Sequence, residues 1–137
     1  AARASDIVIT CTTASRYFLT RDMIRPGTFV AAVGADNENK QEIEPRLMAQ
    51  SKVVTDLTEQ ARKIGDLHHA IGEGAMSVEA VHAQLGEVVA GRKPARQSDE
   101  EIIIFDSTGT GLQDVAAAIA AYHGATRQHV GTSWSLI

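Results

Sequence analysis

Asp36 is the residue whose type and position in this 137-residue sequence point most directly to chemistry. It follows Val33, Gly34 and Ala35 at the end of an apolar run. A carboxylate at the end of a buried strand can lie partly desolvated, where it can take or give a proton. An aspartate beside Asn37 also suits a simple loop turn. The spacing alone therefore leaves a catalytic role and a turn-forming role open.

Short hydroxyl side chains follow another apolar run, at Thr10, Thr12 and Thr13, with Cys11 between them. Small polar groups there suit the ribose or phosphate edge of a nucleotide, and they equally suit a strand-to-helix turn. Cys11 is the only cysteine, which excludes an intrachain disulfide and a metal site built from cysteines alone. No partner base can be identified for it, so its residue type favours a core position over a nucleophile.

A glycine-containing segment, Ser107-Thr108-Gly109-Thr110-Gly111, joins a third apolar run to a helical pattern. Two glycines at this spacing suggest a phosphate cradle. The third glycine position of a dinucleotide fingerprint is occupied by Asp114, whose charge would oppose a pyrophosphate. We therefore interpret this segment as a surface that approaches a ligand closely, and not as the pyrophosphate site.

Metals, nucleic acids and membranes are disfavoured as partners. His68 and His69 are adjacent, so on a helix they point about 100° apart, and His82 belongs to another segment. The net charge is −4 and the basic residues are scattered, which gives no footprint for nucleic acid or an anionic membrane. No apolar run approaches the length of a membrane span. The single cysteine and the lack of a visible signal peptide favour a cytoplasmic protein.

The elements that must position these residues alternate between strands and helices. Strands are predicted at 6–12, 28–34, 52–56 and 101–106, and helices at 19–24, 45–50, 59–71, 77–89 and from 111 onward. This alternation predicts an α/β fold with a mainly parallel sheet. Ligands of such sheets bind at the carboxyl ends of the strands, where the residues above lie. The tail, residues 125–137, has no clear period.

Six stretches together resemble the ornithine cyclodeaminase/mu-crystallin family, in one order over about residues 3–124. They are DIVITCT (6–12), RPGTFVAAVGAD (25–36), KQEIEPRL (40–47), VVTD (53–56), LGEVVAG (85–91) and FDSTGTGLQD (105–114). The resemblance implies an NAD- or NADP-dependent enzyme of small amino or imino acids that forms a homodimer. Such enzymes include ornithine cyclodeaminases, alanine dehydrogenases and ketimine reductases, which pass a hydride at the substrate α-carbon.

The same resemblance implies which part of a fold this chain supplies. Residues 1–124 would be the carboxy-terminal half of an NAD(P)-binding Rossmann domain, a doubly wound and mainly parallel sheet with flanking helices. Residues 125–137 would be a tail without a clear match. The glycine-rich fingerprint is expected before Ala1, so we expect a truncated protein. The strand at 6–12 would then be an apolar edge, and such edges recruit another chain.

The resemblance also assigns roles to individual residues. Asp36 would be the catalytic residue, acting as general acid and base or activating water. The residues implied to line the cofactor site are Thr10, Cys11, Thr12, Val33, Gly34, Ser107, Thr108 and Gly109. The alternative is a truncated, non-catalytic α/β module that binds another molecule.

We predict that the 137-residue chain alone binds NAD(H) very weakly and has no dehydrogenase activity. It lacks a complete glycine-rich fingerprint ahead of a helix for the pyrophosphate, which is the main anchor of a dinucleotide. Calorimetric titration of the chain with NADH measures this directly. A micromolar affinity would contradict the prediction.

Overall fold

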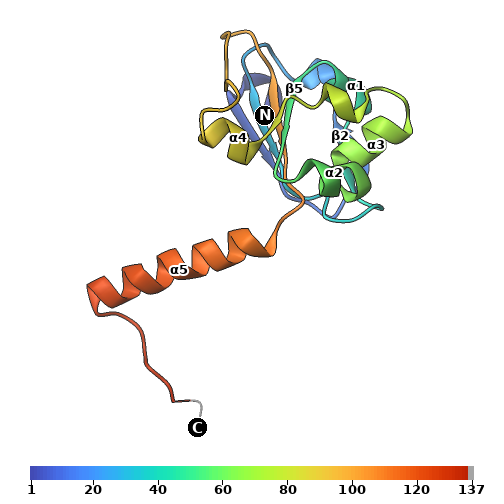
Figure 1. Ribbon diagram of the computed structural model, residues 1–137. Coiled ribbons are helices and arrows are strands. Elements are labelled where there is room, and N and C mark those ends of the chain that lie inside the picture. The colour runs from blue at the N-terminus through green and yellow to red at the C-terminus, as the bar shows by residue number, and fades with distance from the viewer. Residues whose placement is uncertain (136–137) are drawn as a thin grey trace.

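The computed structural model describes residues 1–135, and a five-stranded parallel sheet lies at its centre (Figure 1). The strands lie in the order β1 (Ile7–Thr10), β3 (Phe29–Ala32), β7 (Ile103–Asp106), β5 (Lys52–Thr55) and β6 (Ala83–Gln84). A separate parallel pair is formed by β2 (Ser15–Leu19) and β4 (Gln41–Ile43). The predicted α/β fold with a parallel sheet is confirmed.

The central strands form because each has apolar side chains on both of its faces. In β3, Val30 is buried on one face, while Phe29 is half-buried on the other. The register places Val30 beside Ile104 of β7, and Ile104 beside Val53 of β5. This continuous row of branched side chains is typical of a parallel strand that is covered by helices. It forms the sheet side of the hydrophobic core.

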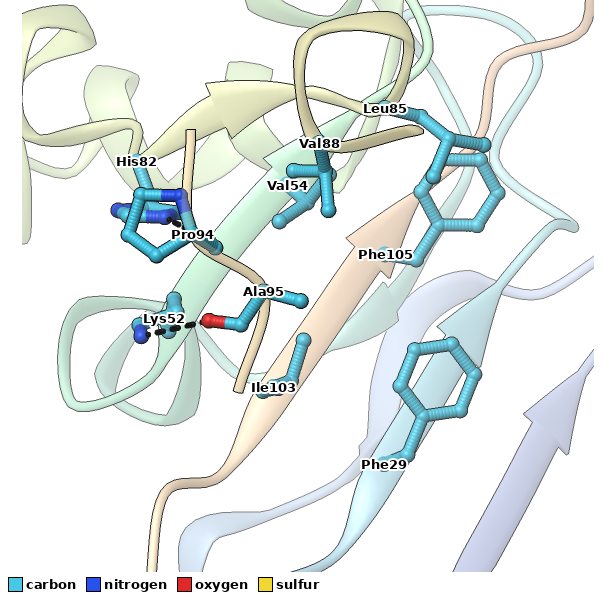
Figure 2. A pocket seen from close by; sticks show the side chains of 10 residues that line it. All are labelled: Phe29, Lys52, Val54, His82, Leu85, Val88, Pro94, Ala95, Ile103 and Phe105. Atoms are coloured by element: carbon cyan, nitrogen blue, oxygen red, sulfur yellow. Dashed lines mark hydrogen bonds between the residues drawn. The ribbon is translucent and has the colours of Figure 1, made fainter. Parts of the chain in front are cut away.

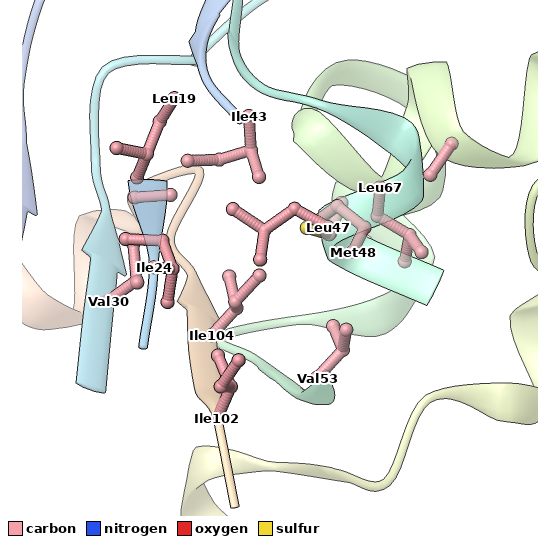
Figure 3. Close-up of a cluster of buried hydrophobic side chains, with 13 residues drawn as sticks. Leu19, Ile24, Val30, Ile43, Leu47, Met48, Val53, Leu67, Ile102 and Ile104 are labelled. Atoms are coloured by element: carbon pink, nitrogen blue, oxygen red, sulfur yellow. The ribbon is translucent and has the colours of Figure 1, made fainter. Parts of the chain in front are cut away.

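Helices cover this face of the sheet from the right in Figure 1. They are α1 (Pro45–Ala49), α2 (Thr58–Ile64) and α3 (Asp66–Gly72). Figure 3 shows Leu47 and Met48 of α1 and Leu67 of α3 pointing toward the row on the sheet. The buried cluster consists of Leu19, Ile24, Val30, Ala32, Ile43, Leu47, Met48, Val53, Ala61, Leu67, Ala70, Ile102 and Ile104.

The opposite face of the sheet is only partly covered. Helix α4 (Leu85–Val89) and the segment 92–101 lie over β5 and β7 and enclose an apolar cavity of about 270 Å³ (Figure 2). Its lining residues are Phe29, Lys52, Val54, His82, Leu85, Val88, Pro94, Ala95, Ile103 and Phe105. Toward β1 the cover ends, and Ile7 and Ile9 are 63% and 68% exposed.

Helix α5 (Gly111–Gln128) leaves the body of the molecule and extends away from it (Figure 1). It begins at Gly111 as predicted, with Thr110 and Gln113 forming a capping box. It continues past residue 124 into the segment for which the sequence showed no period. Leu112, Val115 and Ile119 form an apolar stripe along this helix, and all three are exposed, at 79%, 56% and 52%.

The helix predicted over 59–71 is divided in two at Gly65. The Asp106 carboxylate accepts hydrogen bonds from the backbone amides of Asp66 and Leu67, at 3.4 and 2.9 Å, and these are the first amides of α3. A Cβ on Gly65 would lie 2.6 Å from Asp106 Oδ2, so only glycine permits this approach. A tertiary contact therefore ends α2 and begins α3 where the local sequence favours one continuous helix.

Other segments also differ from the sequence prediction. The expected helix at 77–89 is a 3₁₀ turn (Val78–Ala80), strand β6 and the short helix α4, because the His82 amide donates to Val53 O at 2.9 Å and draws β6 onto the edge of β5. The expected helix at 19–24 is a 3₁₀ turn (Arg21–Met23), and another occurs at Ala2–Ala4. Strands β2 and β4 were not predicted, since β2 is exposed along most of its length and lacks an alternating pattern.

The open edge at β1 predicts self-association of the chain. Within residues 1–135, β1 pairs only with β3, and Ile7 and Ile9 are exposed beside the free edge. Ile9→Lys should shift the chain toward the monomer in sedimentation velocity at high concentration. Val89→Lys, at an equally exposed position on α4, is the matched control and should leave the association unchanged. A wild-type chain that stays monomeric at high concentration contradicts this.

Candidate functional site

The carboxyl ends of β1, β3 and β7 lie side by side, because the register aligns Thr10 with Ala32 and Ala32 with Asp106. The loops that follow these strands therefore emerge at one edge of the sheet. They are the segments 11–14, 33–40 and 107–110. All of the residues proposed from the sequence lie in these loops or at the strand ends that lead into them.

Asp36 is an exposed carboxylate, with 57% of its side chain accessible. Lys40 Nζ lies 2.7 Å from Asp36 Oδ1, and Asn37 Nδ2 donates to the same oxygen at 3.0 Å. The hydrogen bond from Lys40, with its charge and the bond from Asn37, holds the pKa of Asp36 below its usual value. The expected partial desolvation of Asp36 is therefore wrong, and at neutral pH this side chain is a solvated carboxylate that can accept a proton.

The loop after β1 divides its side chains between the interior and the solvent. Thr10 is buried, and its hydroxyl donates to Glu42 Oε2 at 2.6 Å. Cys11 and Thr12 are exposed, so the assignment of Cys11 to the core is wrong. The Thr12 hydroxyl accepts a hydrogen bond from the Ala14 amide at 3.2 Å, which tightens the turn. The side chains of Cys11 and Thr12 are therefore available to a ligand, and the side chain of Thr10 is not.

The loop after β7 is held by Asp56, which follows the end of β5. Asp56 Oδ2 accepts from the amides of Thr108 and Gly109, both at 2.8 Å. Gln60 Nε2 donates to Thr108 Oγ1 at 2.8 Å and to Gly109 O at 2.6 Å. The Ser107 hydroxyl makes the longest hydrogen bond of this group, to Asp56 Oδ2 at 3.4 Å. The two amides that could have received a phosphate are therefore occupied, which agrees with a loop that approaches a ligand without anchoring a pyrophosphate.

Val33 and Gly34 continue β3 toward Asp36. The Val33 amide donates to Thr10 O at 2.9 Å, and the Gly34 amide donates to Glu42 Oε2 at 3.0 Å. Val33 is half-buried and Gly34 is fully buried. Both residues thus fix the start of the loop that carries Asp36.

Three buried carboxyl groups lie behind these loops, on Glu42, Asp66 and Asp106, each with no exposed surface. Asp66 Oδ1 accepts from the amides of Glu42 and Ile43 at 2.8 and 2.9 Å. Burial, together with the negative charge of Asp66, raises the pKa of Asp106 to about 8. Burial likewise raises the pKa of Asp66 to about 6, against the lowering effect of its two amide donors.

Sequence reasoning placed Asp56 and Asp106 at the ends of predicted strands without assigning them a role, and it missed Glu42, Asp66, Lys40 and Gln60. One signal was available: Asp106 and Asp56 each end an apolar strand, as Asp36 follows one. Glu42 gave no such signal, because the strand that carries it was not predicted.

Within residues 1–135, no group of three or more His, Cys, Asp or Glu side chains is arranged to hold a metal ion. His69 Nε2 is 2.9 Å from Lys40 O, and His82 Nε2 is 2.8 Å from Pro94 O. His68 lies against Arg62 O at 3.4 Å. Each ring is engaged with a different backbone carbonyl. No helix in the same part of the chain is long and apolar enough to cross a membrane.

The model of one protein family matches residues 1–129, which is nearly all of the sequence. The chain belongs to the ornithine cyclodeaminase/mu-crystallin family. The resemblance drawn from the six sequence stretches is confirmed.

Individual relatives agree with this membership. An alanine dehydrogenase of Archaeoglobus fulgidus is 42% identical over 127 residues, which is 93% of this chain and 39% of the relative. A solved dimer of an archaeal alanine dehydrogenase with bound NAD has a TM-score of 0.84 at 40% identity, over 96% of this chain and 41% of the other. The pyrroline-2-carboxylate reductase of Thermococcus litoralis, in complex with NADH and L-proline, has a TM-score of 0.88 at 33% identity, over 97% and 42%.

The chain spans about 40% of the length of each of these relatives. The family match over residues 1–129 contains the parallel sheet, the three loops at its carboxyl edge and all of α5.

The raised pKa values of Asp106 and Asp66 predict how stability depends on pH. The folded state keeps protons that the unfolded chain releases near pH 4, so the free energy of unfolding should fall from about pH 4 to about pH 8. One retained proton corresponds to a loss of up to ~1.4 kcal/mol for each pH unit. Asp106→Asn removes the titrating group and should flatten this slope in urea unfolding measured from pH 5 to 8.

Asp114→Asn, at an exposed carboxylate on α5, is the control and should keep the wild-type slope. If the free energy of unfolding of Asp106→Asn falls with pH as steeply as that of the wild type, Asp106 has the same pKa in the folded and the unfolded state, which contradicts the prediction.

Proposed function

We propose that residues 1–124 form the carboxy-terminal half of an NAD(P)-binding Rossmann domain in an amino- or imino-acid oxidoreductase. Family membership and the NAD- or NADH-bound relatives support this proposal. The open edge at β1 supports it too, because doubly wound sheets continue on both sides of the point where their ligand binds. Residues 125–137 would then form a tail, whose first residues belong to α5.

The cofactor site that we infer lies at the carboxyl edge of β1, β3 and β7. The exposed side chains of Cys11 and Thr12 and the loop at Gly109 offer small polar groups and backbone where a nicotinamide and its ribose could approach. The amides of Thr108 and Gly34 are already bonded to buried or half-buried carboxylates, so these residues fit the sugar and base end of the cofactor and not its phosphates. When bound, a nicotinamide cofactor supplies the hydride transfer.

The observation that carries the assignment is the exposed Asp36 carboxylate beside Lys40 at this edge. The lowered pKa keeps Asp36 ionised at neutral pH, which is the form that accepts a proton from a substrate amino group or from water. In the reductive direction the same group returns that proton. Asp36 is therefore proposed as the general base and acid, and Lys40 holds it in place and keeps it ionised between turnovers.

The substrate class that we infer is a small amino or imino acid. The relatives include a dehydrogenase of alanine and a reductase of pyrroline-2-carboxylate, so we favour net oxidation or reduction over cyclodeamination. In a cyclodeaminase the hydride returns to the substrate after ammonia is lost, whereas in a dehydrogenase or reductase it is exchanged with the cofactor pool. We also infer a homodimeric assembly, since the archaeal alanine dehydrogenase is a dimer.

A hybrid enzyme tests the role of Asp36. Residues 1–129 of this chain replace the matched segment of the Archaeoglobus alanine dehydrogenase, and alanine-dependent reduction of NAD is measured. Asp36→Asn in the hybrid should lower kcat by about 100-fold or more, because general acid and base catalysis contributes on that order. NADH affinity, followed by fluorescence, should stay unchanged.

Glu38→Gln is the matched control, since it removes an exposed carboxylate from the same loop and should preserve turnover. Turnover that survives Asp36→Asn would overturn the assignment of this residue.

A further inference from the structure

Glu42 is a fully buried carboxylate that lies outside the three loops of the proposed site. It makes no salt bridge with any residue of the described chain. Its acceptor atoms are satisfied by hydrogen-bond donors from two neighbouring strand ends instead. Oε2 accepts from Thr10 Oγ1 at 2.6 Å and from the Gly34 amide at 3.0 Å, and Oε1 accepts from the Thr12 amide at 2.6 Å.

These donors lie where the pairing of β1 and β3 runs out. The last aligned residues are Thr10 and Ala32, and the Val33 amide still donates to Thr10 O. Beyond that point strands β1 and β3 separate into their loops, and the amides of Thr12 and Gly34 have no partner on a neighbouring strand. A buried amide without an acceptor is costly, so the Glu42 carboxylate takes the place of the missing strand.

Gly34 is matched to this carboxylate by shape. A Cβ at position 34 would lie 2.3 Å from Glu42 Oε1 and 2.6 Å from the Thr12 nitrogen. Any larger residue would push the carboxylate and the loop after β1 away from β3. The glycine before Asp36 is thus explained by the close approach of Glu42, with no need for a phosphate contact.

Glu42 is itself held firmly. Its backbone amide donates to Asp66 Oδ1 at 2.8 Å, and the preceding Gln41 amide donates to Ala14 O at 2.9 Å. The second bond anchors the far end of the loop after β1. The loop is therefore fixed at Thr10, at Thr12 and at Ala14, and two of these three points depend on the Glu42 side chain.

We propose that Glu42 is a positioning residue that sets the spacing between the loop after β1 and the segment Gly34–Asp36. Its consequence for catalysis rests on the proposed function, because those two segments carry the inferred nicotinamide contacts and the proton-transferring carboxylate. Its structural content, a carboxylate that holds two strand ends together, stands independently of that function.

Glu42→Gln tests the proposal in the 137-residue chain. The amide side chain has nearly the same shape but presents an NH₂ group on one side. Whichever way it turns, this NH₂ faces either the Thr12 amide or the Gly34 amide, both of which can only donate. Hydrogen exchange followed by NMR should be about tenfold faster or more at one of these amides, and unchanged at Ile104 in the core.

Glu44→Gln is the matched control. Glu44 lies two residues away and its carboxylate accepts from the Arg21 amide at 2.7 Å, away from the proposed site. A glutamine carbonyl at position 44 can still accept from the Arg21 amide, so Glu44→Gln should leave exchange at Arg21, Thr12 and Gly34 unchanged. If Glu42→Gln does not fold, a through-hydrogen-bond coupling between the Thr12 nitrogen and the Glu42 carboxyl carbon tests the same contact in the wild type. Its absence, in spectra that show the equivalent couplings of the sheet, overturns the proposal.

The hybrid enzyme tests the catalytic consequence. There, Glu42→Gln should raise the KM for NAD by about tenfold or more, with a smaller change in kcat, and Glu44→Gln should change neither. Equal losses of thermal stability in the two variants with no change in KM would reduce Glu42 to a purely structural role and overturn the proposal. A wild-type hybrid without NAD-dependent activity would instead count against the proposed function, and hydrogen exchange would still decide the role of Glu42.

Discussion

The carboxyl group of Asp106 occupies the end of the central strand with no access to solvent, and the rest of this edge is arranged around it. A buried carboxyl group is tolerated only when it is neutral or well supplied with hydrogen-bond donors. Here the first amides of α3 supply them, which brings Asp66 into the interior. Asp66 in turn holds the backbone of β4 and so places Glu42.

This series of contacts runs from the middle of the sheet to the loops that carry the proposed chemistry. Asp106 orients α3, α3 orients β4, and β4 presents Glu42 to the ends of β1 and β3. Each link joins a side-chain carboxyl to backbone amides, which are fixed in direction by the fold. The site is therefore positioned by polar contacts behind it, while the apolar core on the helix-covered face supplies most of the burial.

Four strands of the five-stranded sheet were predicted correctly because each is a short apolar run that can be recognised from neighbouring residues alone. Runs such as Ile102–Phe105 combine β-branched residues with turn signals on both sides, and they leave few alternatives. The edge where the ligand loops gather followed from the parallel arrangement. Asp36 was identified for the same reason, since it directly follows one of these runs.

The elements that escaped prediction depend on partners far away in the chain. The amides that bind Asp106 are about 40 residues distant from it, and Thr12 is 30 residues from Glu42. The break at Gly65 depends on the close approach of Asp106, which residue spacing near Gly65 does not reveal. The low pKa of Asp36 likewise depends on the direction in which Lys40 points, which residue spacing does not determine.

Helix α5 extends away from the body with its apolar stripe in water. Most helical stability in proteins comes from the packing of an apolar face, and α5 lacks such packing within the described chain. The stability of α5 therefore depends on burial of Leu112 and Ile119. Any binding that buries these side chains would also have to supply the free energy that orders the helix. The stability of α5 is thus more sensitive to its surroundings than that of the sheet, whose strands are packed against the buried core.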